Sequence, residues 1–495
     1  MRSTPAYKEK ENEEKIMQKK KRMNGVKSLL RFAEGLLEIL ILTVIYYFVF
    51  RNGYDERLFP EYARYGKYVL CGIYALLTSV LFFGMDGYKF GYLRNGDVLV
   101  SQIISLIISN FITYWQLCLI ANGVITPTPM LMLTLTGVVV ALVCTLFYSF
   151  IYHRMYVPKK MVMIIGRDAA VELKFKMETR PDKYRIVKLI SAEDNLASIY
   201  EQIVNYDAVI INDVPAAIRN DILKFCYHNS LRTYLAPKVT DIIVRGAESI
   251  NLFDTPLLLV KGTGLTSVQR LVKRTMDLVI CSVAAILTAP IMLIIALAIK
   301  LEDGGAVFYK QARMSLDGKV FDILKFRSMI VDAEKDGKSI PATGHDPRIT
   351  KVGRVIRAVR MDELPQLFNI LKGDMSIVGP RPERLEHVVQ YTSQIPEFDF
   401  RTKVKGGLTG YAQIYGKYNT SPYDKLRLDM MYIENYSLML DIKLIMLTLR
   451  IMFNKESTEG FEQAAVMEQQ SHEALEQMKK DAEEASRKEK EHLAT

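Results

Sequence analysis

Cysteine and histidine are scarce in this sequence, which has five cysteines and six histidines among 495 residues. The cysteines are scattered, four of them lie in apolar runs, and their spacing fits neither a zinc site nor a disulfide framework. They are Cys71, Cys118, Cys144, Cys226 and Cys281. His345 and His472 stand apart from other candidate ligands, so neither is expected to bind a metal ion. These absences exclude a disulfide-stabilised secreted domain and favour a protein that faces a reducing cytoplasm.

The sequence also lacks any stripe in which basic and aromatic residues alternate, although its formal net charge is +10. Nucleic acid is therefore not an expected partner. The basic residues gather beside apolar segments and around the candidate catalytic residues, which favours anionic lipid headgroups and phosphorylated substrates. A cleavable signal peptide is not expected, because the first apolar block follows a long charged segment and precedes no small-residue cleavage site.

Four apolar blocks approach the length of about 20 residues that crosses a bilayer. They cover residues 32–50, 68–83, 98–121 and 129–152. The sequence thus predicts four transmembrane helices within 32–153, after a cytoplasmic basic segment at 1–31. Glu34 and Glu38 fall near the start of the first block, where an interfacial position is tolerable. Basic residues in most of the connecting segments place the N-terminus and everything after residue 153 in the cytoplasm, with the basic loop 51–67 as the exception.

Residues 160–263 have the alternation of strands and helices that is typical of a Rossmann-like domain. The expected strands are 161–166, 186–189 and 208–211, and the expected helices are 196–204 and 216–227. A dinucleotide fingerprint needs three glycines, but Gly166 is followed by Arg167, Asp168 and Ala169. We therefore predict a regulatory or scaffolding domain without a bound cofactor. Tyr184 and Lys188 form a Tyr-x-x-x-Lys pattern, which a nucleotide-sugar dehydratase would need on a helix. Here the pattern falls on a strand-like segment, so a catalytic pair is not expected.

A fifth apolar segment, residues 278–300, is long enough to span a bilayer but carries basic residues on both flanks. Basic flanks prefer the same cytoplasmic side. Pro290 lies near the middle, where it removes a helix hydrogen bond and forces a kink. These features predict a re-entrant membrane helix broken at Pro290, and the alternative is an ordinary fifth span. The later segment 438–453 is too polar to span and is expected to lie in the interface.

The pair Asp362-Glu363 is the strongest chemical feature of the sequence. Pro365 marks the start of a helix, whose partial positive charge favours nearby carboxylates. Arg357 and Arg360 precede the pair. An ionised aspartate in such a place suits attack on a phosphate, and the neighbouring glutamate is free to hold a divalent cation. Taken alone, the pair is also compatible with simple helix capping.

Further cations and a glycine-rich turn surround this pair in the sequence. The strand-like segment 320–327 ends with Lys325 and Arg327, and Arg381 lies between two prolines. Residues 405–413 contain three glycines, whose backbone N–H groups are candidates for contact with a phosphate or ribose. Together with the membrane segment, these features favour transfer of a phosphoryl group onto a lipid carrier.

At these motifs, residues 268–453 resemble the bacterial sugar transferases, the monotopic polyprenyl-phosphate phosphoglycosyl transferases. The N-terminal helices and middle domain resemble large members similar to undecaprenyl-phosphate galactose- or glucose-phosphotransferases, which start capsule, exopolysaccharide or O-antigen synthesis. The matching motifs are Lys273-Arg274-x-x-Asp277, Lys325-Phe326-Arg327-Ser328-Met329, Asp362-Glu363-Leu364-Pro365-Gln366-Leu367, Gly373-Asp374-Met375-Ser376, Val378-Gly379-Pro380-Arg381-Pro382 and Gly410-Tyr411-Ala412-Gln413.

The resemblance implies that Asp362 is the nucleophile and that Glu363 binds Mg²⁺. It implies a ping-pong reaction in which a UDP-sugar forms a phosphosugar–aspartyl intermediate, releases UMP and passes the phosphosugar to undecaprenyl phosphate. The positions that match contacts to phosphate or lipid phosphate are Lys325, Arg357 and Arg381. Asp429 matches a further acidic position. A catalytic domain on the cytoplasmic side of the bacterial inner membrane and a homodimer are expected as well.

Two departures from the family pattern affect particular contacts. The family usually has Ser-Pro at the helix break, whereas this chain has Ala289-Pro290, so Thr288 becomes the candidate to brace the kink. A tryptophan common in the last motif is Tyr411 here, which leaves base stacking open.

Two other functions stay open from the residues alone. They are a membrane-anchored nucleotide-sugar dehydratase and a non-catalytic scaffold of a polysaccharide assembly complex. The segment 455–495 is expected to be a charged, solvated tail.

Overall fold

The computed structural model describes residues 33–54, 65–155, 158–166, 170–331, 346–416 and 420–452. The chain divides into two compact units, Met1–Tyr156 and Val157–Thr495. The basic segment predicted at 1–31, the tail predicted at 455–495, and both lone histidines, His345 and His472, lie outside the described residues.

Four helices among the described residues of the first unit are long and apolar enough to cross a bilayer. They are Ala33–Gly53, α3 (Gly66–Gly84), α4 (Asn95–Ile120) and α5 (Thr128–Met155). Large apolar side chains such as Leu36, Phe83 and Leu119 are exposed on their outer faces, as suits helices surrounded by lipid. Each apolar block predicted from the sequence forms one of these helices.

Buried polar side chains join the helices of this unit to one another. Glu38 is only 1% exposed and accepts a hydrogen bond from Nε2 of Gln102 at 2.9 Å, and Oε1 of Gln102 accepts one from Thr145 at 3.2 Å. The hydroxyls of Thr78 and Ser109 join α3 to α4 at 2.7 Å. Interhelical bonds of this kind help to hold membrane helices together. Glu38, which was expected near the interface, is thus enclosed by neighbouring helices.

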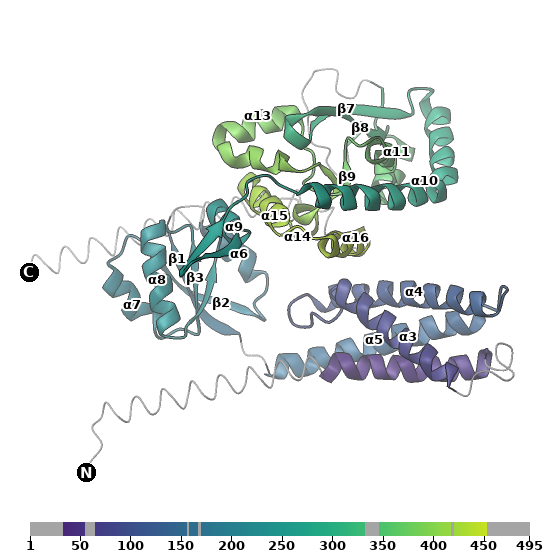
Figure 1. The fold of residues 1–495 in the computed structure, drawn as a ribbon, viewed down its shortest axis with the longest axis horizontal. Helices are drawn as coiled ribbons and strands as arrows, with labels where there is room; N and C mark the ends of the chain where they lie inside the picture. Colours follow the sequence, from purple (N-terminus) through teal and green to yellow (C-terminus); the bar gives the residue numbers. More distant parts are fainter. Residues whose placement is uncertain are drawn as a thin grey trace, which may run out of the picture. The chain divides into compact units, whose positions relative to one another are not determined.

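The second unit begins with a four-stranded parallel sheet in the order β2-β1-β3-β4 (Figure 1). Crossover helices connect its strands, as parallel pairing requires. The strands are β1 (Lys159–Ile165), β2 (Tyr184–Ser191), β3 (Ala208–Asn212) and β4 (Arg232–Leu235). The helices are α6 (Ala170–Glu178), α7 (Leu196–Ile203), α8 (Ala216–His228) and α9 (Val239–Arg245). All the strands and helices predicted here are confirmed, with bounds that differ by up to two residues.

Gly166 ends β1, at the place where a dinucleotide fingerprint would begin. A side chain there would collide with the backbone of Asp213, so the close approach of two backbones explains the glycine. The positions that follow it, 167–169, lie outside the described residues.

This first part of the second unit packs against the later part of the same unit. Nζ of Lys176 lies 2.9 Å from the carboxylate of Asp424, which belongs to α15 (Pro422–Glu434). Gly246, directly after α9, packs so closely on Glu434 that a side chain there would collide with it. The parallel sheet therefore has a fixed place beside α15.

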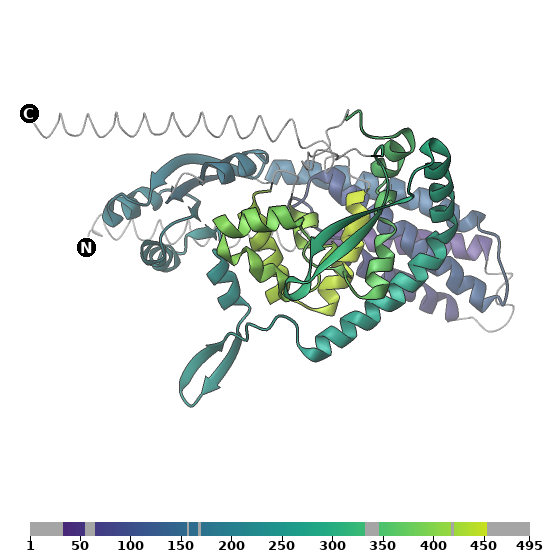
Figure 2. The same ribbon diagram turned by 90° about the horizontal axis from the view of Figure 1, so that it is seen from above.

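A β-hairpin that was not predicted from the sequence follows α9. Its strands are β5 (Glu248–Leu252) and β6 (Thr255–Leu259), paired antiparallel. Figure 2 shows the hairpin projecting away from the other elements of its unit. At its tip, Phe253 is 97% exposed and has a φ of 57°, a conformation that bulky residues rarely adopt.

Helix α10 (Ser267–Asp303) contains 37 residues and includes the fifth apolar segment. The side chain of Thr266 caps its first turn, and Gly304 ends it in the left-handed conformation. Pro290 lies inside α10, and the helix changes direction along its length in both views (Figures 1 and 2). A proline within a helix is the usual cause of such a bend. Thr288 donates a hydrogen bond to the carbonyl of Ala284 at 2.7 Å, a bond type that adds to the bending.

The rest of the unit carries the candidate catalytic residues on short elements. An antiparallel hairpin, β7 (Phe308–Met314) and β8 (Val320–Phe326), confirms the strand predicted at 320–327. The other short elements are a parallel pair, β9 (Ser376–Val378) with β10 (Gly407–Thr409), and the helices α11 (Lys351–Ala358), α12 (Gln366–Lys372), α13 (Leu385–Gln394) and α14 (Tyr411–Tyr415). The 3-10 helices are η1 (Leu316–Gly318), η2 (Met361–Glu363) and η3 (Pro396–Lys403).

The last described helix, α16 (Leu438–Met452), has two different faces. Leu444, Leu447 and Asp441 are fully buried in the core, whereas Met439 is 72% exposed. Asp441 is one of the charged residues that made this segment too polar to be predicted as a membrane span, and its side chain lies in the protein core. The predicted place of α16 in the membrane interface stays a prediction.

Candidate active site

The two acids lie in a tight turn between α11 and α12. After Ala358, Arg360 adopts a left-handed backbone with a φ of 56°, which redirects the chain. Met361–Glu363 then form η2, and Pro365 caps α12. The prediction that a proline starts the helix after the acids is confirmed, with Pro365 one position before the first helical residue, Gln366.

Glu363 is held between two cations from different elements. Its Oε1 accepts hydrogen bonds from Nζ of Lys325 at 2.8 Å and from Nη2 of Arg381 at 3.0 Å. Burial alone would raise the pKa of Glu363, but Arg381 and Lys325 hold it well below its usual range. Glu363 is therefore a fixed anion that orients both cations. The structure brings together three of the residues predicted from the sequence.

Asn369 fastens the strand that carries Lys325 to the helix that follows the acids. Its Oδ1 accepts from the backbone N–H of Leu324 at 2.9 Å, and its Nδ2 donates to the carbonyl of Asp322 at 2.8 Å. Asn369 is 3% exposed. Sequence reasoning missed this residue, because a side-chain amide within a helix carries no signal until its strand partner is known.

Asp362 is half-buried next to this ion cluster. Burial raises the pKa of its carboxyl group, Lys325 opposes the shift, Glu363 adds to it and Arg357 opposes it. The protein thus stabilises the charge on Asp362 less than the charge on Glu363. A carboxylate that is poorly stabilised and only half-buried is suited to act as a nucleophile.

Arg381 lies in a loop whose backbone is paired on both sides. The backbone N–H of Gly407 donates to the carbonyl of Pro380 at 2.9 Å, and that of Gly379 donates to the carbonyl of Thr409 at 2.8 Å. These bonds continue the parallel pairing of β9 and β10. The loop is therefore part of the scaffold and not a free surface segment.

The glycine-rich turn that was predicted to approach a phosphate packs instead against this loop. The N–H of Gly406 donates to the hydroxyl of Ser315 at 3.0 Å, and the N–H of Gly407 is used as described above. A side chain at Gly407 or Gly410 would collide with the backbone of Gly379. The phosphate-binding interpretation is wrong for the N–H groups of Gly406 and Gly407, because both are already paired within the protein.

Asp429 lies behind the Arg381 loop. It is fully buried and accepts two hydrogen bonds from Arg401 at 2.6 and 3.0 Å. Arg401 also donates to the backbone carbonyl of Arg381 at 2.9 Å. The sequence makes Asp429 a candidate substrate-binding residue, and in the structure its carboxylate is fully buried and paired with Arg401.

The two remaining predicted cations have different surroundings. The guanidinium of Arg327 forms an ion pair with Asp303 at the end of α10, and its side chain is 10% exposed. The structure thus engages Arg327 in tying β8 to α10 and does not bring it to the acids. Arg357 is half-buried on α11 and lowers the pKa of Asp362 by its charge.

The motif Lys273-Arg274-x-x-Asp277 attaches the first half of α10 to the C-terminal end of α12. Arg274 donates from Nη1 to the carbonyl of Ile370 at 2.5 Å and from Nη2 to that of Leu371 at 2.7 Å. These are carbonyls of the last turn of α12, where that of Ile370 also accepts from the N–H of Gly373 at 3.1 Å and side chains commonly supply further donors. A helix long enough to span a membrane is in this way joined to the helix that follows Asp362 and Glu363.

The other two residues of the motif are buried and paired as well. Lys273 forms an ion pair with Asp441 of α16 at 2.6 Å. Asp277 accepts hydrogen bonds from the hydroxyl of Ser376 at 2.7 Å and from the N–H of Ile377 at 3.1 Å. The motif is thus a structural joint between α10, α12, β9 and α16.

Glu363 and Asp362 together fit a divalent cation only with help from a substrate. No group of three His, Cys, Asp or Glu side chains that could enclose a metal ion occurs in the part of the chain that the structure describes. Mg²⁺ is commonly bound by one or two protein carboxylates together with substrate phosphates. Both hydrogen bonds to the cations go to Oε1 of Glu363, so Oε2 and the Asp362 carboxylate form a donor set that suits Mg²⁺ bound with a diphosphate.

A family model described as "Bacterial sugar transferase" matches residues 268–455. This range contains every candidate catalytic residue described above and begins at the first turn of α10.

Several curated proteins are similar to parts of the chain. A UDP-glucose:undecaprenyl-phosphate glucose-1-phosphate transferase from Klebsiella pneumoniae is 38% identical over 247 residues, which are 49% of this chain and 51% of the relative. A UDP-N-acetylgalactosamine-undecaprenyl-phosphate N-acetylgalactosaminephosphotransferase from Aeromonas hydrophila is 33% identical over 63% of this chain and 71% of its own. A glucose-1-phosphate transferase with the same description as the first, from Caulobacter vibrioides, is 42% identical over 36% of this chain and 67% of its own. The chain spans about half the length of the first curated relatives that it matches.

Proposed function

The chain belongs to the bacterial sugar transferase family, and from this premise we propose that it transfers a sugar 1-phosphate from a UDP-sugar to undecaprenyl phosphate and releases UMP. The observation that carries the proposal is the pairing of two unlike carboxylates. Asp362 is half-buried with a raised pKa, next to Glu363, which is locked between Lys325 and Arg381. This arrangement supports the proposal, because an Asp362 carboxylate that acts as the nucleophile would have beside it cations able to stabilise a phosphoryl group.

The reaction proceeds in two displacements at one phosphorus atom. An oxygen of Asp362 attacks the β-phosphorus of the UDP-sugar, the bond from that phosphorus to the bridging oxygen breaks, and UMP leaves with the electron pair. A phosphate oxygen of undecaprenyl phosphate then attacks the same phosphorus and displaces the Asp362 carboxylate. The product is the lipid-linked diphosphate sugar, and no strong general base is needed because the lipid phosphate is already largely ionised.

The surrounding residues bind and orient the substrate phosphates. Lys325 and Arg381 face the site from β8 and from the loop after β9, and Arg357 approaches Asp362 from α11. Mg²⁺ held by Glu363 and the substrate diphosphate would offset negative charge on the transferring group. The sugar is glucose or galactose in this proposal, since the relatives named above include glucose-1-phosphate transferases.

The arrangement in the membrane is part of the same proposal. The four helices of the first unit cross the bacterial inner membrane, and α10 enters and leaves by the cytoplasmic leaflet through the bend at Pro290. This topology leaves Asp362 and Glu363 in the cytoplasm, where UDP-sugars are available. The parallel sheet acts as a Rossmann-like scaffold without a cofactor, and the protein works as a homodimer that starts capsule, exopolysaccharide or O-antigen synthesis.

The test is a transfer assay with the purified full-length protein in detergent. The protein is mixed with UDP-glucose or UDP-galactose labelled in the β-phosphate, without lipid, and UMP is measured. Undecaprenyl phosphate is then added, and the label is expected to move into the lipid fraction. A wild-type protein that releases no UMP from either donor and labels no lipid would contradict the proposal and favour the scaffold alternative.

A further inference from the structure

The loop that presents Arg381 to Glu363 rests on a buried ion pair that does not touch the acids. Arg401 is 7% exposed and Asp429 is 0% exposed. Nη2 of Arg401 donates both to Oδ2 of Asp429 at 2.6 Å and to the carbonyl of Arg381 at 2.9 Å. One guanidinium therefore joins the buried carboxylate to the backbone of the residue that holds Glu363.

The other contacts of the pair show what it supports. Oδ1 of Asp429 is buried and has no hydrogen-bond partner within the described part of the chain, so Arg401 is the group that this carboxylate holds. The ring of Phe398 lies 4.8 Å from the guanidinium of Arg401. Nη1 of Arg401 lies 3.7 Å from the carboxylate of Glu383, two residues after Arg381. Arg401 is thus fixed from several directions while it donates to the loop.

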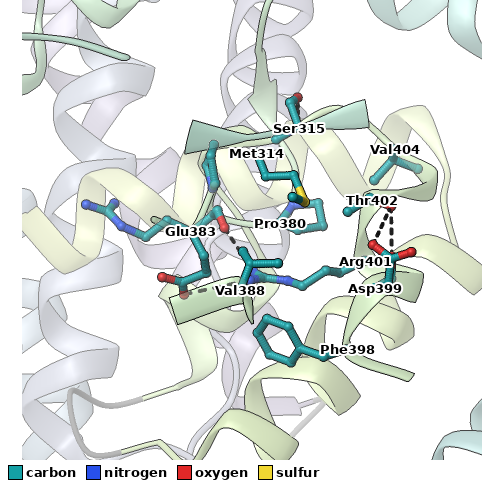
Figure 3. A pocket seen from close by; sticks show the side chains of 13 residues that line it. Met314, Ser315, Pro380, Glu383, Val388, Phe398, Asp399, Arg401, Thr402 and Val404 are labelled. Atoms are coloured by element: carbon teal, nitrogen blue, oxygen red, sulfur yellow. Dashed lines mark hydrogen bonds and ion pairs between the residues drawn. The ribbon is translucent and has the colours of Figure 1, made fainter. Parts of the chain in front are cut away.

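A small cavity is lined by Arg401 and by residues of the loop that carries Arg381 (Figure 3). Its volume is ≈ 20 Å³, which is about the space that one water molecule needs. Among the residues around it are Arg381, Pro382, Phe398 and Arg401. The backbone of the loop is paired at Gly379 and Pro380, and Arg401 adds the side-chain hydrogen bond to the carbonyl of Arg381 itself.

We propose that Asp429, acting through Arg401, is a positioning residue that fixes the backbone at Arg381 and so aims its guanidinium at Glu363. The expected loss of kcat rests on the proposed function. The expected effect on the backbone at Arg381 does not. Asp429 touches neither substrate nor the reacting atoms. Asp429 holds the guanidinium of Arg401 in an orientation in which it donates both to the Asp429 carboxylate and to the carbonyl of Arg381. A lysine ammonium cannot reproduce this planar set of donors.

The test uses Asp429→Asn and Arg401→Lys, each alone and combined with Arg381→Lys. The matched control is Asp441→Asn, because Asp441 forms an equally buried ion pair with Lys273. Among the described residues, Asp441 bonds to neither Arg381 nor Arg401, and it reaches β9 only through the hydroxyl of Tyr432. UMP release, KM and the melting temperature are measured for every variant. A misplacement of about 1 Å at a phosphate-binding group can cost about a hundredfold in rate, so we expect kcat of Asp429→Asn and Arg401→Lys to fall at least about tenfold.

The decisive readout is the coupling with Arg381. If Asp429 acts through Arg381, adding Asp429→Asn to Arg381→Lys should change kcat much less than it does in the wild type. Asp441→Asn should lower the melting temperature by a similar amount and show the same fold-change in kcat in both backgrounds. Equal fold-changes for Asp429→Asn in both backgrounds would overturn the proposal while leaving the transferase function intact.

A second measurement needs no catalytic activity and therefore separates this inference from the proposed function. Amide hydrogen exchange of residues 379–385, which follow β9, should be faster in Asp429→Asn than in the wild type and in Asp441→Asn. Unchanged exchange in these residues would refute the positioning role. Faster exchange in a protein whose wild-type form releases no UMP would support the positioning role and reject the transferase function.

Discussion

Asp362 and Glu363 are neighbours in the chain, yet their surroundings shift their pKa values in opposite directions. Burial raises the pKa of Asp362, whereas Arg381 and Lys325 overcome burial at Glu363 and hold its pKa well below the usual range. Opposite shifts of neighbouring acids are a sign of separate roles. Glu363 stabilises the fold once it is ionised above its ordinary pKa of about 4.3, and this contribution is lost as pH falls below that value.

The first prediction is that Asp362→Asn abolishes UMP release without weakening the fold. Loss of a covalent nucleophile normally costs several powers of ten in rate, and we expect at least about a thousandfold. An acid with a raised pKa disfavours folding once it is ionised, so removing the charge should leave the melting temperature equal or higher. Asp374→Asn, at the far end of α12, is the control and should keep normal UMP release. Activity of Asp362→Asn within about tenfold of the wild type would refute the assignment.

The second prediction concerns the metal ion. Glu363→Gln should remove most of the Mg²⁺-dependent turnover, since a neutral amide binds hard cations weakly. It should also lower the melting temperature, because Lys325 and Arg381 would lose their shared partner. A titration of UMP release against Mg²⁺ concentration checks this. An unchanged rate and Mg²⁺ dependence would show that Glu363 is not the ligand and that another carboxylate holds the metal ion.

The third prediction concerns the pH dependence of the first displacement. Lys325 is the largest influence that favours the ionised form of Asp362, so Lys325→Met should raise the pKa of Asp362 further. The acidic limb of a plot of kcat/KM for UMP release against pH should then move to higher pH. Arg327→Lys serves as the control, since Arg327 pairs with Asp303, and should leave the limb in place. A limb that does not move in Lys325→Met would mean that Lys325 does not govern the nucleophile.

Among the secondary-structure elements, those with periodic apolar patterns were the ones that the sequence could predict. The strands of the parallel sheet and the apolar helices all carry such patterns. The hairpin β5–β6 could not be predicted, because its turn places Phe253 at positive φ, where sequence rules expect glycine or asparagine. Without glycine or asparagine at the turn, the usual local signal of a hairpin is missing from this segment.

In the candidate site, too, some residues could be predicted from the local sequence and others could not. The acids, Lys325 and Arg381 belong to recognisable motifs, and the structure joins them as predicted. The pair Arg401–Asp429 connects residues 28 apart, each of which resembles an ordinary surface charge in isolation. Burial and pairing are properties of the folded chain, so the role of Asp429 could not be derived from the residues around it.

The fourth prediction concerns helix α10. If it is re-entrant, single cysteines at Arg270 and Ala306 should both react with a membrane-impermeant thiol reagent only from the cytoplasmic side. Both residues are exposed, and they flank the stretch from Arg274 to Asp303, whose end residues are paired with other elements. The background carries Cys144→Ala, because Cys144 is the least buried native cysteine.

The matched variant for this experiment is Pro290→Ala. It restores a helix hydrogen bond and removes a ring clash, which favours a straight helix long enough to cross. Labelling at position 306 should then become mixed between the two sides, and UMP release should fall. Labelling of Ala306→Cys from the periplasmic side in the presence of Pro290 would refute the re-entrant topology.

On the scale of the whole molecule, the two compact units suggest that catalysis resides in the second. The relative from Caulobacter vibrioides is matched over 67% of its own length by 182 residues of this chain, so a region of this kind can form most of a protein. The fifth prediction is that a chain starting at Val157 stays membrane-bound through α10 and keeps UMP release within about tenfold. Membrane fractionation and the UMP assay check this, with the first unit alone as the control. A soluble or inactive second unit would show that the first unit is required.

The buried bond between Glu38 and Gln102 has a consequence for the biogenesis of the protein. The two residues are 64 positions apart, so the first helix leaves the ribosome well before its partner on α4. At a synthesis rate of about 5–20 residues per second, Gln102 is synthesised roughly 3 to 13 seconds after Glu38. During this interval the helix carries an unpaired acid that lipid cannot solvate. If the four helices cross a bilayer as proposed, we expect the first helix to stay beside the insertion machinery until α4 arrives, so that the earliest segment to be synthesised is one of the last to be released into the bilayer.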